Sequence, residues 1–139
     1  MASPPRNVLL VEPWLGGSHQ AWAEGLQRTS RHSIEVLGRP PGSWRTTFEH
    51  SARELAEAAG PAPDIVIASS MMDTAEFLAR AGFEQVPTLL YLHENQLTYD
   101  RDQPDLARGA ANWRSVRAAD RIAFNSHFHL DDFFGALPL

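Results

Sequence analysis

The sequence contains no cysteine and no lysine. Without cysteine, the 139 residues can form neither a disulfide framework nor a thiolate metal site, so packing alone must stabilise the chain. All 12 basic residues are arginine, a bias that GC-rich coding produces without functional pressure. The formal net charge of −5 argues against broad, nonspecific nucleic-acid binding, which usually needs a large positive face. A local basic patch remains compatible with this charge.

Long apolar runs are absent as well. No stretch approaches the roughly 20 apolar residues that cross a bilayer, and residues 1–6 lack the apolar segment of a signal peptide. We therefore expect a cytoplasmic protein with no membrane partner. A content of 43% hydrophobic and 21% charged residues in a chain of this length predicts one globular domain over residues 1–139.

Short apolar runs that alternate with amphipathic segments fill most of the chain. Buried strands are predicted over residues 7–12, 33–37, 64–68, 86–92 and 120–124. Helices are predicted over residues 18–28, 73–80 and 109–119, along the stripe Phe48, Ala52, Leu55, Ala56 and Ala59, and after residue 126. This alternation demands a parallel sheet with helices on both faces. The predicted fold class is α/β, a Rossmann-like doubly wound parallel sheet of about five strands.

Three helix starts carry capping signals. Ser18 and Ser126 are placed to cap the first and last helices, and Asp73 with Glu76 looks like a capping box. Gly82 lies just beyond the end of the helix that Asp73 opens, where a left-handed residue is common.

Ligands of open α/β sheets bind beyond the carboxyl ends of the strands, so residues that follow each strand are the most informative. After the first strand, the segment from Glu12 to Gln20 contains Gly16 and Gly17. Paired glycines let a backbone approach a ligand, and the next helix start offers free N–H groups to an anion. The alternatives are a plain tight turn for the glycines and a surface or capping role for His19.

A second polar segment follows the fourth strand. It places His93, Glu94, Asn95 and Gln96 in sequence at the strand terminus. A structural loop rarely needs these four residue types together, so we favour a functional role for this segment over a structural one.

After the fifth strand, Asn125 and Ser126 present small polar groups at a helix start, where a simple N-cap is an equally good reading for Ser126. His127 and His129 are two residues apart on a helix and face different directions, so they are poor joint metal ligands. We predict no metal site.

Five arginines lie close in sequence to Trp113 and Tyr99, and they allow a phosphate-contacting face with aromatic stacking: Arg101, Arg108, Arg114, Arg117 and Arg121. Four aspartates in the same region largely cancel their charge, namely Asp100, Asp102, Asp105 and Asp120. A solvated face of mixed charge is therefore the better interpretation.

Three segments in order and spacing, residues 8–19, 92–99 and 119–126, resemble the tRNA-queuosine α-mannosyltransferase family, also described as glycosyltransferase-like domain-containing proteins with an N-terminal domain of unknown function. The resemblance runs from about Asn7 to the end of the chain, and its most specific part is the string His93 to Gln96. It implies the N-terminal, acceptor-side half of a two-domain (GT-B) enzyme. Such an enzyme retains configuration, uses no metal, and moves mannose from GDP-mannose to queuosine in tRNA.

The resemblance also implies roles for individual residues. Gly16 and Gly17 would face the donor phosphates or the sugar, and His93 with Glu94 would sit at the reacting sugar. Hydroxyl groups of donor or acceptor would be held by His19, Asn95, Gln96, Asn125 and Ser126. No tightly bound cofactor is implied, and catalysis would rest on orientation and on stabilising the leaving diphosphate.

Two function classes therefore compete. The first is an acceptor-binding half of a mannosyltransferase that is inactive until a C-terminal nucleotide-sugar-binding domain completes it. The second is a non-catalytic, stand-alone binding domain, which predicts an exposed apolar patch or a homodimer interface on the cleft face. A flavodoxin-like or response-regulator-like domain fits poorly, because neither a phosphate loop nor a phospho-acceptor aspartate follows the strands.

Overall fold

The computed structural model describes residues 3–137 and contains a five-stranded parallel sheet. Its strands are β1 (Asn7–Glu12), β2 (Ser33–Gly38), β3 (Ile65–Ser69), β4 (Thr88–Leu92) and β5 (Arg121–Phe124). They lie in the order β2-β1-β3-β4-β5, and every neighbouring pair is parallel. The predicted fold class is confirmed, and each strand boundary lies within two residues of its predicted place.

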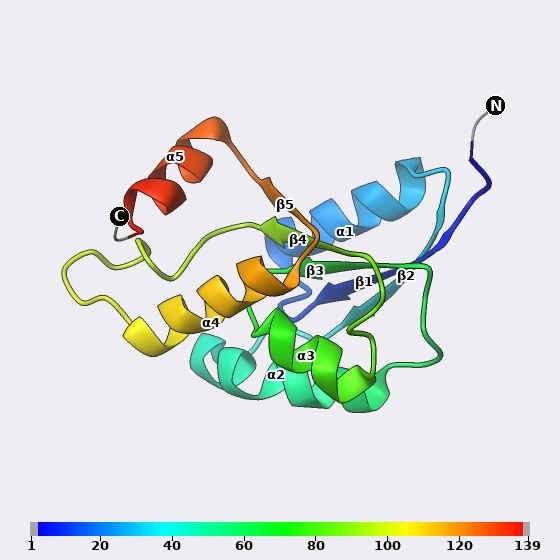
Figure 1. Ribbon diagram of the computed structural model, residues 1–139, viewed down its shortest axis with the longest axis horizontal. Helices are drawn as coiled ribbons and strands as arrows, with labels where there is room; N and C mark the ends of the chain where they lie inside the picture. Colours follow the sequence, from blue (N-terminus) through cyan, green and yellow to red (C-terminus); the bar gives the residue numbers. More distant parts are fainter. Residues whose placement is uncertain (1–2, 138–139) are drawn as a thin grey trace.

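Five helices follow the strands: α1 (Gly17–Thr29), α2 (Trp44–Ala58), α3 (Thr74–Ala81), α4 (Leu106–Ala118) and α5 (His127–Gly135). Figure 1 shows α1 on one face of the sheet and α2, α3 and α4 side by side on the other, while α5 lies near the end of the molecule opposite the N-terminus. Right-handed crossovers between parallel strands produce this two-sided cover.

The first strand shows how the core is divided. Val8 and Leu10 join a cluster with Ala23 of α1, whereas Leu9 and Val11 point the other way, into the larger cluster around Leu55 of α2. A strand covered on both faces must be apolar at every position, because its side chains alternate between two cores. The continuous apolar run after Asn7 is the sequence consequence.

Three of the four predicted capping residues are confirmed, although the Glu76 side chain pairs with Arg80 rather than returning the second bond of a capping box. The Asp73 carboxylate accepts from the Glu76 N–H, Gly82 takes a left-handed φ of 72°, and the Ser126 hydroxyl accepts from the His129 N–H. The prediction for Ser18 is wrong. Gly16 is the N-cap of α1, so Ser18 already lies in the first turn, and the helix start has no side-chain cap.

Helix α4 also begins earlier than predicted, at Leu106 rather than Gly109. Asp105 causes the difference, since its carboxylate accepts from the Arg108 N–H and caps the additional turn.

The strand order places a topological switch point between β1 and β3. From β1 the chain crosses to β2 on one side, and it later returns to pair β3 on the other side. Crossovers that diverge in this way leave a crevice beyond the carboxyl ends of the two central strands. The fold therefore directs attention to Glu12, the last residue of β1, and to the residues after β3 and β4.

Candidate functional site at the carboxyl ends of the strands

Glu12 is the centre of this crevice and is fully buried. One carboxylate oxygen lies 3.1 Å from His19 Nδ1 and accepts from the Trp14 N–H, and the other lies 3.1 Å from His93 Nε2. A charged side chain is rarely buried unless it is paired and hydrogen-bonded, and this carboxylate meets both conditions. Glu12 thus joins the loop after β1 to the loop after β4.

The two histidines bound by Glu12 are stacked. Their ring centroids lie 3.8 Å apart with an angle of 22° between the planes. Trp22 of α1 and Tyr91 of β4 stack on each other at 4.5 Å and contact the His93 ring edge-on. Packing on several sides therefore fixes the orientation of His93.

The charges of this group follow from its contacts. Burial opposes ionisation of Glu12, but the hydrogen bonds from His19 and His93 prevail and lower the pKa of this carboxyl from 4.5 to about 2. For His19, burial opposes the charged form, yet the contact with Glu12 raises the pKa above 6.5. An ionised carboxylate can only accept, so His93 donates from Nε2 and, when neutral, keeps Nδ1 as an acceptor.

The same three side chains form the one group with metal-ligand geometry within residues 3–137. One nitrogen of His19, one of His93 and a Glu12 oxygen all lie within 4.8 Å of one another. Two histidines and a carboxylate are a familiar zinc donor set. These atoms already hydrogen-bond to each other, however, so a metal ion would have to displace the bridging protons. The absence of a metal from the mechanism stays a prediction.

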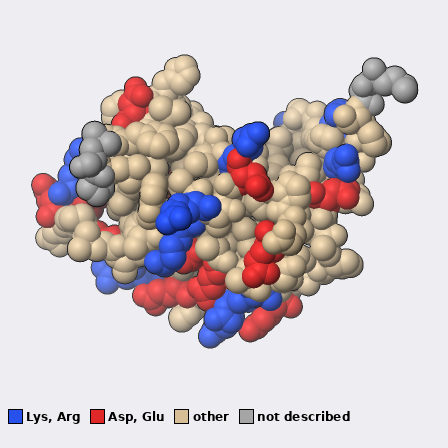
Figure 2. Space-filling model, viewed as in Figure 1, with Lys and Arg blue, Asp and Glu red and all other residues tan. Residues whose placement is uncertain are grey.

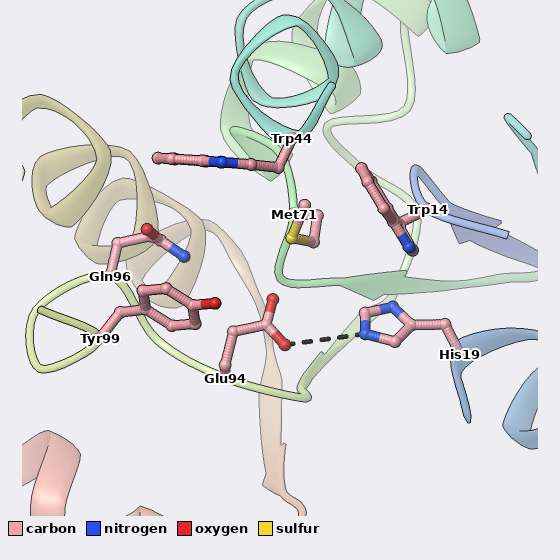
Figure 3. A pocket seen from close by; sticks show the side chains of 7 residues that line it. All are labelled: Trp14, His19, Trp44, Met71, Glu94, Gln96 and Tyr99. Carbon is pink, nitrogen blue, oxygen red and sulfur yellow. Dashed lines mark ion pairs between the residues drawn. The ribbon is translucent and has the colours of Figure 1, made fainter. Parts of the chain in front are cut away.

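Glu94 extends the site toward a cavity of about 270 Å³. The cavity is lined by Trp14, His19, Trp44, Met71, Glu94, Gln96 and Tyr99. In Figure 3 the Glu94 carboxylate points into the opening, with Trp44 and Tyr99 on one side and Trp14 and His19 on the other. His19 Nε2 lies 3.7 Å from a Glu94 oxygen, and burial raises the pKa of this carboxyl above 4.5 although both histidines oppose the rise.

The glycine pair has two separate structural reasons. A side chain at Gly16 would meet Pro41 Cγ at 2.2 Å, so close packing demands glycine there. Gly17 takes a left-handed φ of 54° with open space around it, so its backbone conformation favours glycine. Both statements agree with a tight turn. The start of α1 has no side-chain cap, and ligand binding by these glycines stays a prediction.

Asn95 and Gln96 are buried and have different surroundings. The Asn95 side-chain oxygen accepts from the N–H and hydroxyl of Thr98, which closes a local turn. Gln96 reaches the cavity, and its N–H donates to Asn112 of α4 at 2.6 Å. Asn112 also donates to the Ser70 carbonyl oxygen, so α4 anchors the loops after β3 and β4 together.

Asn125 and Ser126 lie on the far side of the Glu94 loop. Asn125 donates to the His93 carbonyl oxygen at 2.6 Å, and its own side-chain oxygen lies 3.1 Å from His129 Nδ1. Ser126 caps α5, as its alternative interpretation held. Both residues border an open cavity of about 290 Å³ together with His93 and Glu94. The predicted site residues all follow the carboxyl ends of β1, β4 and β5, so the structure places them at one edge of the sheet.

The arginine group is a face of mixed charge. Arg101 pairs with Asp132, Arg108 with Asp105, and Arg114 with Asp73. Figure 2 likewise shows acidic and basic side chains beside one another rather than separated into fields. These pairs favour the solvated mixed face over a phosphate-binding surface.

Sequence reasoning missed the central carboxylate and the aromatic walls. Glu12 was predicted only as the end of a strand, and Trp14, Trp44 and Met71 received no role. A signal for Glu12 did exist, because a carboxylate that ends a wholly apolar buried strand must find partners. The convergence of Trp44 with Trp14 had no local signal, since they belong to different segments.

Within residues 3–137, no helix is both long enough and apolar enough to cross a membrane. The fold and the cavity together define a Rossmann-like α/β domain with a candidate ligand crevice at the carboxyl ends of β1, β3 and β4.

The chain belongs to the family described as tRNA-queuosine alpha-mannosyltransferase N-terminal, which it matches over residues 7–139. A tRNA-queuosine alpha-mannosyltransferase of Drosophila melanogaster is 30% identical to it over 140 residues, which cover 96% of this chain. The match covers 37% of that relative, so the chain spans well under half of its length. No solved structure matches the chain.

Proposed function

We propose that this chain is the acceptor-side half of a mannosyltransferase that moves mannose from GDP-mannose to queuosine in tRNA, in the cytoplasm. A C-terminal nucleotide-sugar-binding domain would complete the enzyme and supply the contacts to the diphosphate. The support is the match to the family together with one observation: the buried Glu12 holds His19 and His93 beside a cavity at the switch point.

His93 would act at the reacting hydroxyl or sugar. Glu12 accepts from Nε2, which leaves Nδ1 free to accept a proton or hydrogen bond from an acceptor hydroxyl. Fixed polar groups that are oriented before the substrate arrives lower the barrier most, and the stacked rings provide this rigidity. Glu94 would hold the acceptor, and the uncapped start of α1 after Gly17 would face the donor.

The apolar surface of α5 is the proposed contact for the completing domain. Phe128, Leu130 and Phe134 are exposed there by 78%, 38% and 48%. Exposed aromatic side chains that gather on one helix commonly mark an interface. The same surface favours the second candidate, a stand-alone binding domain that forms a homodimer.

One experiment tests the proposal and separates it from the alternative. The chain is joined to the C-terminal domain of a family member, and transfer of labelled mannose from GDP-mannose to queuosine-containing tRNA is measured. We expect activity only in the joined protein, and none with tRNA that lacks queuosine. If the joined protein is folded but inactive, and the isolated chain is a dimer, the stand-alone reading replaces the enzyme reading.

A further inference from the structure

We propose that the cavity enclosed by Trp14, Trp44 and Tyr99 binds the planar base of the acceptor nucleoside, with its amino groups donating to Glu94. This inference rests on the proposed function, because it names the part of the acceptor that occupies this cavity. It assigns a role to three aromatic residues that the histidine and carboxylate group leaves unused.

The walls have the chemistry of a base-stacking site. Trp14 follows β1, Trp44 opens α2, and Tyr99 follows β4, so three distant segments place aromatic rings around one opening (Figure 3). Trp44 is 42% exposed and Tyr99 is 70% exposed. Exposed rings at the mouth of a cavity gain stability when a flat, apolar ring packs on them, and nucleobases offer such a face.

The Trp44 ring is held in position before any ligand binds. The Arg108 guanidinium lies 4.2 Å from its ring centroid and is itself paired with Asp105, which caps α4. A cation over an aromatic face restrains the ring, and a ring that is already oriented loses less entropy on binding. The Arg45 guanidinium also lies over this ring, 5.3 Å from its centroid, and Trp44 lines the cavity.

The polar groups of the cavity select a ligand that donates hydrogen bonds. Glu94 Oε1 is buried and makes no well-formed hydrogen bond among the described residues, although the buried Ser70 hydroxyl lies near enough to the carboxyl to oppose the rise of its pKa. A buried carboxyl oxygen without a partner is costly, and an amino group of a ligand would satisfy it. A phosphate would place its negative charge beside this carboxyl group and could not donate a hydrogen bond to it. The cavity therefore suits the base rather than the diphosphate of the donor.

The loop that carries the polar groups is anchored from behind. Asn112 of α4 accepts from the Gln96 N–H and donates to the Ser70 carbonyl oxygen, next to Met71 on the cavity wall. Asn112 is fully buried, so water does not compete for these hydrogen bonds. Helix α4 therefore holds the segment before Met71 and the segment that carries Gln96 in fixed positions. A site that binds one rigid ring requires such support.

Calorimetric titration of the chain with free queuosine tests this inference directly. Trp44→Ala and Tyr99→Ala are compared with Trp113→Ala, a control on α4 outside the cavity whose 40% exposure matches that of Trp44. We expect each cavity variant to weaken binding by roughly tenfold or more, and the control to change it by less than about twofold. Guanosine should bind more tightly than inosine, which lacks one amino group, and Glu94→Ala should remove that preference.

The inference is overturned if no base binds saturably at millimolar concentration, if the cavity variants bind queuosine as well as the control, or if inorganic pyrophosphate, which carries no base, competes for the cavity. Circular dichroism checks that the variants fold, and the highly exposed Tyr99 keeps the test valid if Trp44→Ala does not fold. Aromatic-dependent binding without mannose transfer in the joined protein would leave this site standing and remove the proposed function. Transfer with an unchanged kcat/KM in both cavity variants would instead remove the base site and leave the proposed function standing.

Discussion

At the amino-terminal edge of the sheet, Asp64 and Asp120 each precede a strand, and each accepts a hydrogen bond of 2.8 Å from the first N–H of a neighbouring strand. Both are exposed. At the carboxyl edge, Glu12 is fully buried between two histidines, and Glu94 keeps one buried oxygen without a partner. The aspartates accept hydrogen bonds from strand N–H groups. The glutamates accept from no strand N–H group, and they place carboxyl groups in the crevice.

This difference teaches how to separate structural from functional carboxylates in one fold. A structural carboxylate accepts a hydrogen bond from the backbone, and water solvates its charge. A buried carboxylate whose partners are titratable side chains carries a desolvation cost that backbone bonding does not explain, and such groups concentrate at functional sites. The comparison predicts that activity depends on the carboxyl edge, and that the amino edge affects stability alone.

The largest expected effect is on catalysis at the carboxyl edge. His93→Ala in the joined enzyme should lower kcat for mannose transfer by about 10²–10³-fold, because it removes the oriented ring beside the reacting groups. The unfolding midpoint should fall as well, because the buried Glu12 loses one of its two histidine partners, so kcat is measured well below the midpoint of the variant. Turnover near the parent value would remove His93 from the mechanism.

The next effect is on folding. Glu12→Ala should lower the free energy of unfolding by about 3 kcal/mol, because it leaves two partly buried histidines without their shared acceptor. Urea denaturation of the chain measures the change. Glu12→Gln keeps the size and one acceptor oxygen, so it should cost less. Equal stability of Glu12→Ala and the parent would contradict the assignment of Glu12 as the centre of the site.

A pH series sharpens the same point. Because the folded-state pKa of His19 is raised above 6.5, its interaction with Glu12 stabilises the protein fully below pH 6.5, and the benefit is lost as pH rises through the folded value. The stability advantage of the parent over His19→Gln should therefore shrink as pH rises above 6.5, as urea denaturation at a series of pH values would show. In a Glu12→Gln background the pH dependence should weaken to the part that Glu94 contributes, since a Glu94 oxygen lies 3.7 Å from His19 Nε2. An undiminished dependence would contradict Glu12 as the main partner of His19.

A smaller effect is expected at the amino edge. Asp64→Ala removes the acceptor of the Asn7 N–H and should cost about 1 kcal/mol of stability, the usual contribution of one exposed hydrogen bond. Asp120→Ala, its equivalent at β4, should behave alike. Mannose transfer by both variants should stay within about twofold of the parent. A large loss of transfer in a folded variant would break the distinction between the two edges.

The smallest expected effect tests the histidine and glutamate group as a metal site. Treatment of the joined enzyme with a chelator should leave transfer unchanged, because the hydrogen bonds of Glu12 already use the atoms that a metal would need. Loss of activity that zinc restores would instead assign Glu12, His19 and His93 as ligands.

Most of the fold could be predicted because its signals are local. The run Asn7–Glu12 is apolar at every position, as burial on both faces requires, and Asp73 with Glu76 and Gly82 bounds α3 by capping contacts within a few residues. Ser18 shows the limit of such signals. A serine and a glycine two positions apart in a turn can both serve as N-cap, and the packing of Gly16 on Pro41, 25 residues away, is a contact that no local pattern contains.

The site was predictable as an edge of the sheet but not as a set of contacts. His93 and Glu94 stand at the end of β4, where the general rule for parallel sheets directs attention. The hydrogen bond between His93 and Glu12 spans 81 residues, and the cavity adds Trp44 from a helix that carried no polar motif.

The sequence by itself determined the order of strands and helices, the burial of the strands and the three polar segments, since each depends on neighbours a few residues apart. Only the tertiary structure decided that Glu12 bridges His19 and His93, and that three aromatic rings enclose Glu94. The physical reason is that a charge, a pKa and a cavity wall depend on distances in space. Those distances are set when the parallel crossovers bring the carboxyl ends of β1, β3 and β4 to one edge.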